Sequence, residues 1–174
     1  GQVFTSAGAG LSQGFEAAAG GGKVLQVLQD TLLSTTSTTA TAFEDIAGLT
    51  IDITPAATSS KILVMAQISS FNSGANLWFS LVRDSTEVFL GDAASNRIRI
   101  TTGASGTTTT GARAQQNAAI IYLDSPSSTS ALTYKVQFRV SESATAYVNV
   151  TANDTDSTTY PRAASSITVM EIGA

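Results

Sequence analysis

Short runs of β-branched and aromatic residues recur along the chain from residue 23 onward, separated by clusters of Ser, Thr, Gly, Asp and Asn. The runs favour strands and the polar clusters favour turns. A spacing of roughly ten residues between such runs is typical of an all-β sandwich or barrel. We see no segment with a 3.6-residue apolar period that reaches helical length. The predicted strands are residues 23–30, 41–46, 49–54, 61–70, 76–83, 87–90, 97–102, 113–124, 133–140, 145–150 and 166–172.

The first 22 residues differ in composition from the rest of the chain. They are rich in Gly and Ala and end in the low-complexity run AAAGGG. Because glycine costs about 1 kcal/mol per helix position, this run does not favour a helix. We expect residues 1–22 to form an N-terminal arm or linker and residues 23–174 to form one β-sandwich domain.

Successive side chains of a strand point to opposite faces, so the apolar pattern shows how many faces are buried. Apolar and polar residues alternate in residues 133–140, which predicts one buried and one wet face. The runs 61–70, 76–83 and 113–124 are apolar at both sets of positions. A two-layer sandwich covers only one face of each strand, so the second face needs another partner. The chain's own arm or loops, a register shift at a bulge, or a neighbouring subunit would each explain the pattern, and we favour the subunit.

The chain contains no histidine and no cysteine. It therefore lacks a Ser-His-Asp or Cys-His nucleophile, an imidazole acid–base group and an ordinary zinc site. Its formal net charge of −4 argues against a nucleic-acid partner, which normally requires a basic surface. No apolar run approaches the roughly 18 residues that suggest a membrane-spanning helix, so we expect no membrane insertion.

Paired carboxylates are the remaining route to catalysis. A glycosidase needs two of them about 5–10 Å apart, one with a raised pKa. The candidate pairs all lie in turns or at strand ends, where acids are usually solvated. We therefore expect that the protein is not an enzyme. The pairs are Asp154 with Asp156, Glu44 with Asp45, and Asp84 with Glu87.

The segment Asn153-Asp154-Thr155-Asp156 offers oxygen ligands at alternate positions, which suits a hard cation such as calcium. The alternative is a turn in which the Asn and Asp side chains bond to the nearby backbone. We favour the turn, and we predict no cofactor elsewhere in the chain.

Loops on a rigid sandwich are the expected location of binding residues. Sugar recognition uses aromatic rings together with Asn, Asp and Arg hydrogen bonds. The candidates for contact with a receptor are the loop residues Asn72, Asn76, Asp92, Asn96, Tyr160 and Arg162.

Several stretches, taken in order and spacing, resemble a known family. Together they are similar to the C-terminal β-domain of tailed-bacteriophage tail fibres and related virion surface proteins. A glycine-rich leader, VFTSAGAG at residues 3–10 followed by Phe15, resembles the segment that precedes such domains. The stretches are GKVLQV at 22–27, ITP at 53–55, SSKILV at 59–64, LDSP at 123–126, TYKV at 133–136, NDTD at 153–156 and SITVMEI at 166–172.

The resemblance implies a two-sheet jelly roll like that of the C1q and tumour-necrosis-factor group, assembled as a homotrimer. In that group the inner sheet packs on neighbouring subunits, and two strands close to the three-fold axis correspond to residues 61–70 and 113–124. We therefore expect an interface that includes Ile62, Val64, Ile120 and Tyr122.

The function implied is that of a virion structural protein at the particle surface. We expect the tip domain of a tail fibre, which attaches to a glycan or protein of the host cell surface and contacts other virion proteins through its N-terminal arm. A decoration protein that stabilises the phage head is the first alternative, and a glycan-degrading tailspike enzyme is the second.

Overall fold

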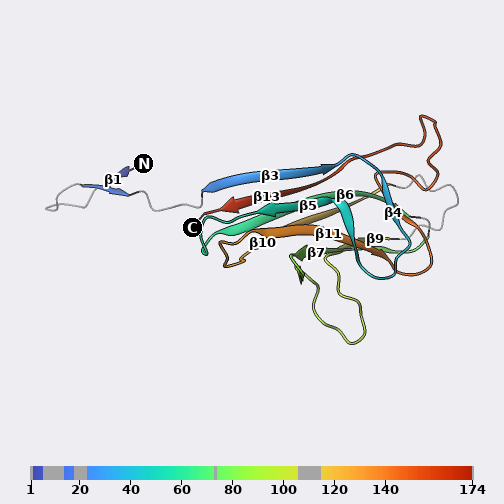
Figure 1. The fold of residues 1–174 in the computed structure, drawn as a ribbon, viewed down its shortest axis with the longest axis horizontal. Coiled ribbons are helices and arrows are strands. Elements are labelled where there is room, and N and C mark those ends of the chain that lie inside the picture. The colour runs from blue at the N-terminus through green and yellow to red at the C-terminus, as the bar shows by residue number, and fades with distance from the viewer. Residues whose placement is uncertain (1, 6–13, 18–22, 73, 106–114, 174) are drawn as a thin grey trace.

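The β-branched runs of the sequence form strands in the computed structural model (Figure 1). The structure describes residues 2–5, 14–17, 23–72, 74–105 and 115–173, and no helix occurs among them. Within residues 1–22, where we expected an arm or linker, β1 (Gln2–Thr5) and β2 (Gly14–Ala17) pair as an antiparallel ribbon.

The larger sheet has six strands arranged around β6. Strand β13 pairs with the first half of one edge of β6, β12 pairs with its last residues, and β10 pairs with the other edge. Strand β3 pairs with β13, and β4 pairs with β12. The bounds are β3 Val24–Leu32, β4 Thr36–Thr38, β6 Lys61–Asn72, β10 Gln116–Asp124, β12 Ala146–Val148 and β13 Ser165–Ile172.

The smaller sheet has five strands, in the order β5-β11-β7-β8, with β9 on β7. All of its pairs are antiparallel. The bounds are β5 Glu44–Ile53, β7 Leu77–Arg83, β8 Thr86–Val88, β9 Thr102–Ala104 and β11 Leu132–Val140.

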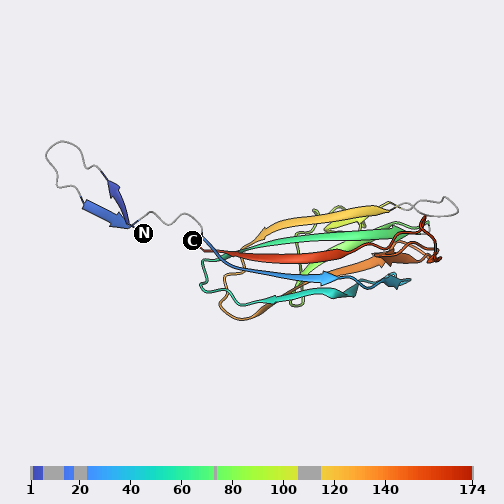
Figure 2. The same ribbon diagram turned by 90° about the horizontal axis from the view of Figure 1, so that it is seen from above.

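The two sheets form a sandwich with the strand order of a jelly roll. The orders β3-β13-β6-β10 and β5-β11-β7-β8 place consecutive strands mostly in opposite sheets, as two Greek keys do. Figure 1 shows the two layers, and Figure 2 shows β10, β6, β13 and β3 side by side in that order. The predicted all-β two-sheet sandwich is confirmed.

The core lies between the sheets and includes the predicted buried face of β11, whose residues alternate between buried and half-buried along its length. The core also contains Ile62, Val64 and Ile120, which are at most 1 % exposed. Tyr122 is half-buried against the same core. Ile62, Val64 and Ile120, which we expected at a subunit interface, instead pack against the chain's own second sheet and leave no exposed surface for a neighbouring subunit.

Several strand boundaries differ from those predicted. Residues 41–46 and 49–54 do not form two strands but contribute to the single strand β5, because Gly48 adopts a φ of +91° and lets the strand continue through an irregularity in its pairing with β11. Residues 97–102 were predicted as a strand but lie largely in a loop closed by its own hydrogen bonds, with Ile98 exposed. The short strand β4 was not predicted.

The chain itself covers part of the second apolar face of β7. Strand β9 pairs with its first residues, and the hydroxyl of Thr101 accepts a hydrogen bond from the Leu81 backbone N–H at 2.9 Å. The guanidinium of Arg139 lies 5.1 Å from the centre of the Trp78 ring. For this strand, the interpretation that the chain's own loops cover the face accounts for the pattern.

A buried polar network links β7, β10 and β11 near one end of the core. The carboxylate of Asp124 accepts hydrogen bonds from Arg83 Nη1 at 2.5 Å and from the Tyr134 hydroxyl at 2.6 Å. Asp124 and Tyr134 are buried, while the Arg83 side chain remains about one quarter exposed. The network satisfies the polar groups that the apolar core would otherwise leave unpaired.

The free energy of unfolding is expected to fall at alkaline pH because of Tyr134. Burial, and then its hydrogen bond to Asp124, raise the pKa of the hydroxyl above its ordinary value of 10.0. The folded protein thus keeps a proton that the unfolded chain loses. The contribution is complete below about pH 10 and declines above it by about 1.4 kcal/mol per pH unit. We therefore expect the free energy of unfolding of the wild type to approach that of Tyr134→Phe as the pH rises from about 9 to about 11. Urea denaturation at a series of pH values measures both free energies. If the free energies of unfolding of the two proteins change in parallel with pH, the Tyr134 hydroxyl is not the cause of the loss.

Candidate functional site

The loop that connects β12 to β13 is held at its base by a buried asparagine. Asn149 is fully buried and adopts a φ of +64°, a conformation that Asn tolerates better than most residues. Its Nδ2 donates to the carbonyls of Leu32 at 2.7 Å and Ser34 at 3.0 Å, and its Oδ1 accepts from the Ser165 hydroxyl at 2.7 Å. One side chain therefore joins the loop to the ends of β3 and β13.

Backbone contacts extend this anchor to β6 and across the loop. The N–H of Asn149 donates to the Ser69 carbonyl at 2.9 Å, and the N–H of Ser69 donates to the Ser165 hydroxyl at 3.0 Å. Val150 and Arg162 form an isolated antiparallel bridge. The base of the loop is consequently fixed by the sandwich, while the tip is exposed.

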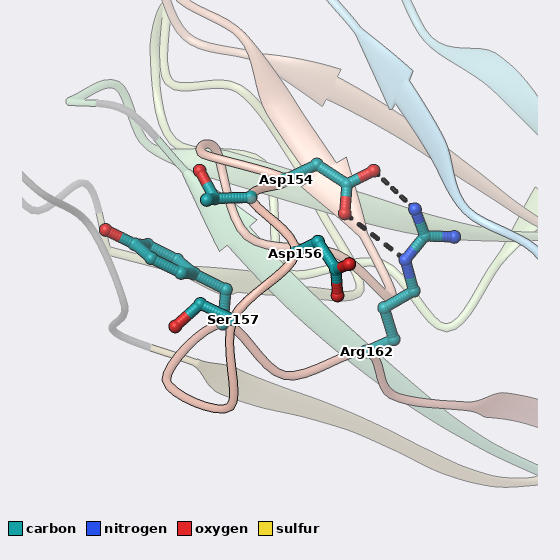
Figure 3. Close-up of a pocket in the computed structure, with 6 residues that line it drawn as sticks. Asp154, Asp156, Ser157 and Arg162 are labelled. Atoms are coloured by element: carbon teal, nitrogen blue, oxygen red, sulfur yellow. Dashed lines mark hydrogen bonds and ion pairs between the residues drawn. The ribbon is translucent and has the colours of Figure 1, made fainter.

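The tip of the loop encloses a polar pocket with a volume of about 350 Å³ (Figure 3). Tyr160 is half-buried, and the other lining residues are exposed. The turn is closed by a hydrogen bond from the Tyr160 N–H to the Ser157 carbonyl at 3.0 Å. The lining consists of Asp154, Thr155, Asp156, Ser157, Tyr160 and Arg162.

Arg162 engages the carboxylate of Asp154 with two nitrogens. Its Nε donates to Oδ1 at 3.2 Å and its Nη2 to Oδ2, as the dashed lines in Figure 3 mark. Asp156 lies beside this pair, and no ion pair or hydrogen bond of its side chain occurs within the described residues. The calcium ligands considered from sequence thus include one carboxylate that already has a cationic partner. Among the described residues, no group of three or more acidic side chains is arranged to hold a metal ion.

The structure brings together Tyr160 and Arg162 of the predicted receptor contacts, but not the others. Asn76 lies in the turn before β7, where its N–H donates to the Ser141 hydroxyl at 3.1 Å. Asp92 and Asn96 lie on the separate exposed loop between β8 and β9. The side chain of Asn72 is outside the described residues. The neighbours Asp154 and Asp156, considered only for calcium or catalysis, join Tyr160 and Arg162 at the pocket.

A second feature is the outward side of the six-stranded sheet, on the far side of β6 and β10 from the core. Residues paired directly across antiparallel strands share a face, so the registers define three rows. We call these twelve residues the outer face. The rows are Leu123, Leu63, Met170 and Val27; then Ile121, Met65, Thr168 and Gln29; then Ala119, Gln67, Ser166 and Thr31.

Seven of the twelve outer-face residues are apolar, five are uncharged polar residues, and none is charged. Ile121 is 67 % exposed, Val27 is 52 % exposed and Leu123 is 48 % exposed. A groove of about 370 Å³ crosses β6, β10 and β13 where the side chains Ala119 and Ser166 are small. The five-stranded sheet, in contrast, carries the ion pair of Lys135 with Asp45 on its surface.

The edge of β10 continues this apolar surface around the side of the sandwich. Phe89, directly after β8, is 46 % exposed and adopts a φ of +56°, an uncommon conformation for a bulky residue. Its ring stacks on Tyr122, with 4.9 Å between the centroids. The predicted interface residue Tyr122 therefore contacts an exposed ring at the junction of the two sheets.

No helix in the described residues is long and apolar enough to cross a membrane.

No protein-family model matches the chain, and no curated protein matches it either.

Comparison with solved structures gives weak matches to chains from structures of infectious bursal disease virus. The VP2 subviral particle has a TM-score of 0.40 and 10 % identity, and the match covers 97 % of this chain and 43 % of the VP2 chain. The structure of the Gt strain matches with a TM-score of 0.40 and 11 % identity, over 98 % of this chain and 45 % of the chain in that structure. The Gx strain has a TM-score of 0.38 and 9 % identity over the same shares. This chain thus spans less than half the length of each of these proteins.

Proposed function

We propose that this chain is a non-enzymatic structural protein of a bacteriophage virion, and that it forms the trimeric tip of a tail fibre that attaches the particle to the host surface. The resemblance of its sequence to tail-fibre C-terminal domains supports the proposal. The jelly-roll strand order is the one expected for a C1q-like or tumour-necrosis-factor-like trimer.

The outer face is the observation that carries the proposal. Large exposed apolar surfaces on a soluble protein commonly mark interfaces. Here they lie in register across β3, β13, β6 and β10, with no charge to interrupt them. A partner of the same sequence fits this surface, because a neutral face brings no like charges together when copies assemble around an axis.

Trimeric assembly would also give attachment its strength. Three copies of a weak binding site on one particle raise the overall avidity well above the affinity of each copy. The exposed loop between β12 and β13 lies at the end of the sandwich remote from Lys23, whose carbonyl accepts from the Gly173 N–H at 2.8 Å (Figure 1). Receptor contacts at that end would leave the other end for the rest of the virion.

Light scattering tests the assembly. We expect the wild-type protein to have three times the monomer mass of 17.8 kDa at micromolar concentration. Ile121→Asp should raise the protein concentration needed to form the trimer at least tenfold, because it buries an unpaired charge at the interface. Leu33→Asp is the matched control, since Leu33 is similarly exposed at 73 % but follows β3 outside the outer face. A monomeric wild type, or an Ile121→Asp protein as trimeric as the control, would reject the outer face as the interface.

A further inference from the structure

We propose that the pocket lined by Asp154, Asp156, Tyr160 and Arg162 binds a neutral or amino sugar at the exposed end of a cell-surface glycan. The inference rests on the proposed attachment function and adds to it the position of the site and the class of ligand. No residue of the outer face takes part in it.

The first support is that the pocket is held in place before any ligand arrives. Asn149 is fully buried, and the three hydrogen bonds of its side chain fix the base of this loop to the sandwich. The Val150 and Arg162 bridge closes the loop above that anchor. A fixed frame lowers the entropic cost of ordering the binding residues, which matters most for a small and weakly bound ligand.

The second support is the chemistry of the lining. A sugar ring presents an apolar face of C–H groups and an edge of hydroxyls, so it needs an aromatic surface beside paired acceptors and donors. The half-buried Tyr160 supplies the ring, and the carboxylate and guanidinium of the Asp154–Arg162 pair supply acceptors and donors. The volume of about 350 Å³ lies at the small end of ligand pockets, which suits one or two sugar units.

The net charge of the pocket further limits the class of sugar that it would bind. The guanidinium of Arg162 is paired with Asp154, so the carboxylate of Asp156 leaves the pocket with a net negative charge of one. Acidic sugars would meet this carboxylate with a like charge, which is unfavourable at short range. Neutral sugars meet no such penalty, and an amino sugar would pair with Asp156.

Saturation-transfer NMR on the full chain tests the site with three sugars that share the glucose ring: N-acetylglucosamine, glucosamine and glucuronate. We expect transfer to the first two at Kd values on the order of 1–10 mM. Transfer to glucuronate should be at least fivefold weaker. Tyr160→Ala should abolish the signal, whereas Tyr160→Phe should retain most of it because the ring remains. Glu142→Gln, at an exposed acid between β11 and β12, is the control and should change nothing.

Charge reversal supplies an independent variant if Tyr160→Ala disturbs the loop. Asp156→Lys should move the preference toward glucuronate, because the new ammonium pairs with the carboxylate of that sugar. The proposal is overturned if none of the three sugars receives transfer, if glucuronate binds the wild type best, or if the order is unaffected by Asp156→Lys. Light scattering on the same samples keeps the two proposals apart. A trimer that binds no sugar overturns only the sugar site, and a monomer that binds through Tyr160 overturns only the trimer.

Discussion

Replacing Asn149 with Ala is expected to lower the free energy of unfolding by about 4 kcal/mol, the largest effect of any single substitution considered. The change removes three hydrogen bonds: two buried ones, to Leu32 and Ser165, and a part-buried one to Ser34. Each buried group left unpaired costs about 1 kcal/mol or more. The φ of +64° adds about 1 kcal/mol for a residue with a Cβ and no local polar side chain.

Urea denaturation followed by circular dichroism measures this loss. Asn149→Gly relieves the backbone strain but not the lost hydrogen bonds, so it should still cost about 3 kcal/mol. Asn96→Ala, on the exposed loop between β8 and β9, is the matched control and should stay within about 0.5 kcal/mol of the wild type. A loss below about 1 kcal/mol in Asn149→Ala would mean that the loop is not anchored through this side chain.

Asp124→Ala is expected to cost about 3 kcal/mol, because it leaves the Arg83 guanidinium and the buried Tyr134 hydroxyl without their acceptor. The estimate is at the low end for a broken buried pair, since Arg83 retains some access to water.

Asp45→Ala provides the comparison for that measurement. Asp45 also accepts from a cation, Lys135 Nζ at 2.8 Å, but its side chain is 48 % exposed. Exposed ion pairs contribute at most about 1 kcal/mol, so this variant should remain close to the wild type in the same urea titration. Equal losses in the two variants would show that burial does not strengthen the contacts of Asp124.

The sequence was sufficient for the fold class and for those strands whose two faces differ. In β11 the alternation of apolar and polar residues identified the buried face correctly. In β6 and β10 apolar residues occupy the positions of both faces, so periodicity could not show whether Ile120 or Ile121 points into the core. The predicted interface used the set of alternate positions that contains Ile120. Only the packing of the second sheet against Ile62 and Ile120 settles which side is inside.

The candidate pocket was found in part because its residues are close in sequence. Asp154, Asp156, Tyr160 and Arg162 lie within one loop, and each drew attention by residue type alone. Asn149 was missed because it ends a run of strand formers, and nothing in that run shows that the carbonyls of Leu32 and Ser34 fold back beside it. The signal that could have found it is an Asn at the end of an apolar strand, where a left-handed backbone is common.

The distance between the anchor at Asn149 and the chain's exit at Lys23 has a mechanical consequence. Asn149 and its backbone join the pocket loop to the far ends of β3, β13 and β6, whereas Lys23 and Gly173 meet at the near end. A pull applied between the pocket loop and Lys23 would act along these strands. Antiparallel hydrogen bonds lie across the strand direction, so such a pull shears many of them together instead of opening them one by one. The hydrogen bonds of the sandwich are therefore arranged to resist tension along its long axis, which is the direction of load under the proposed attachment function.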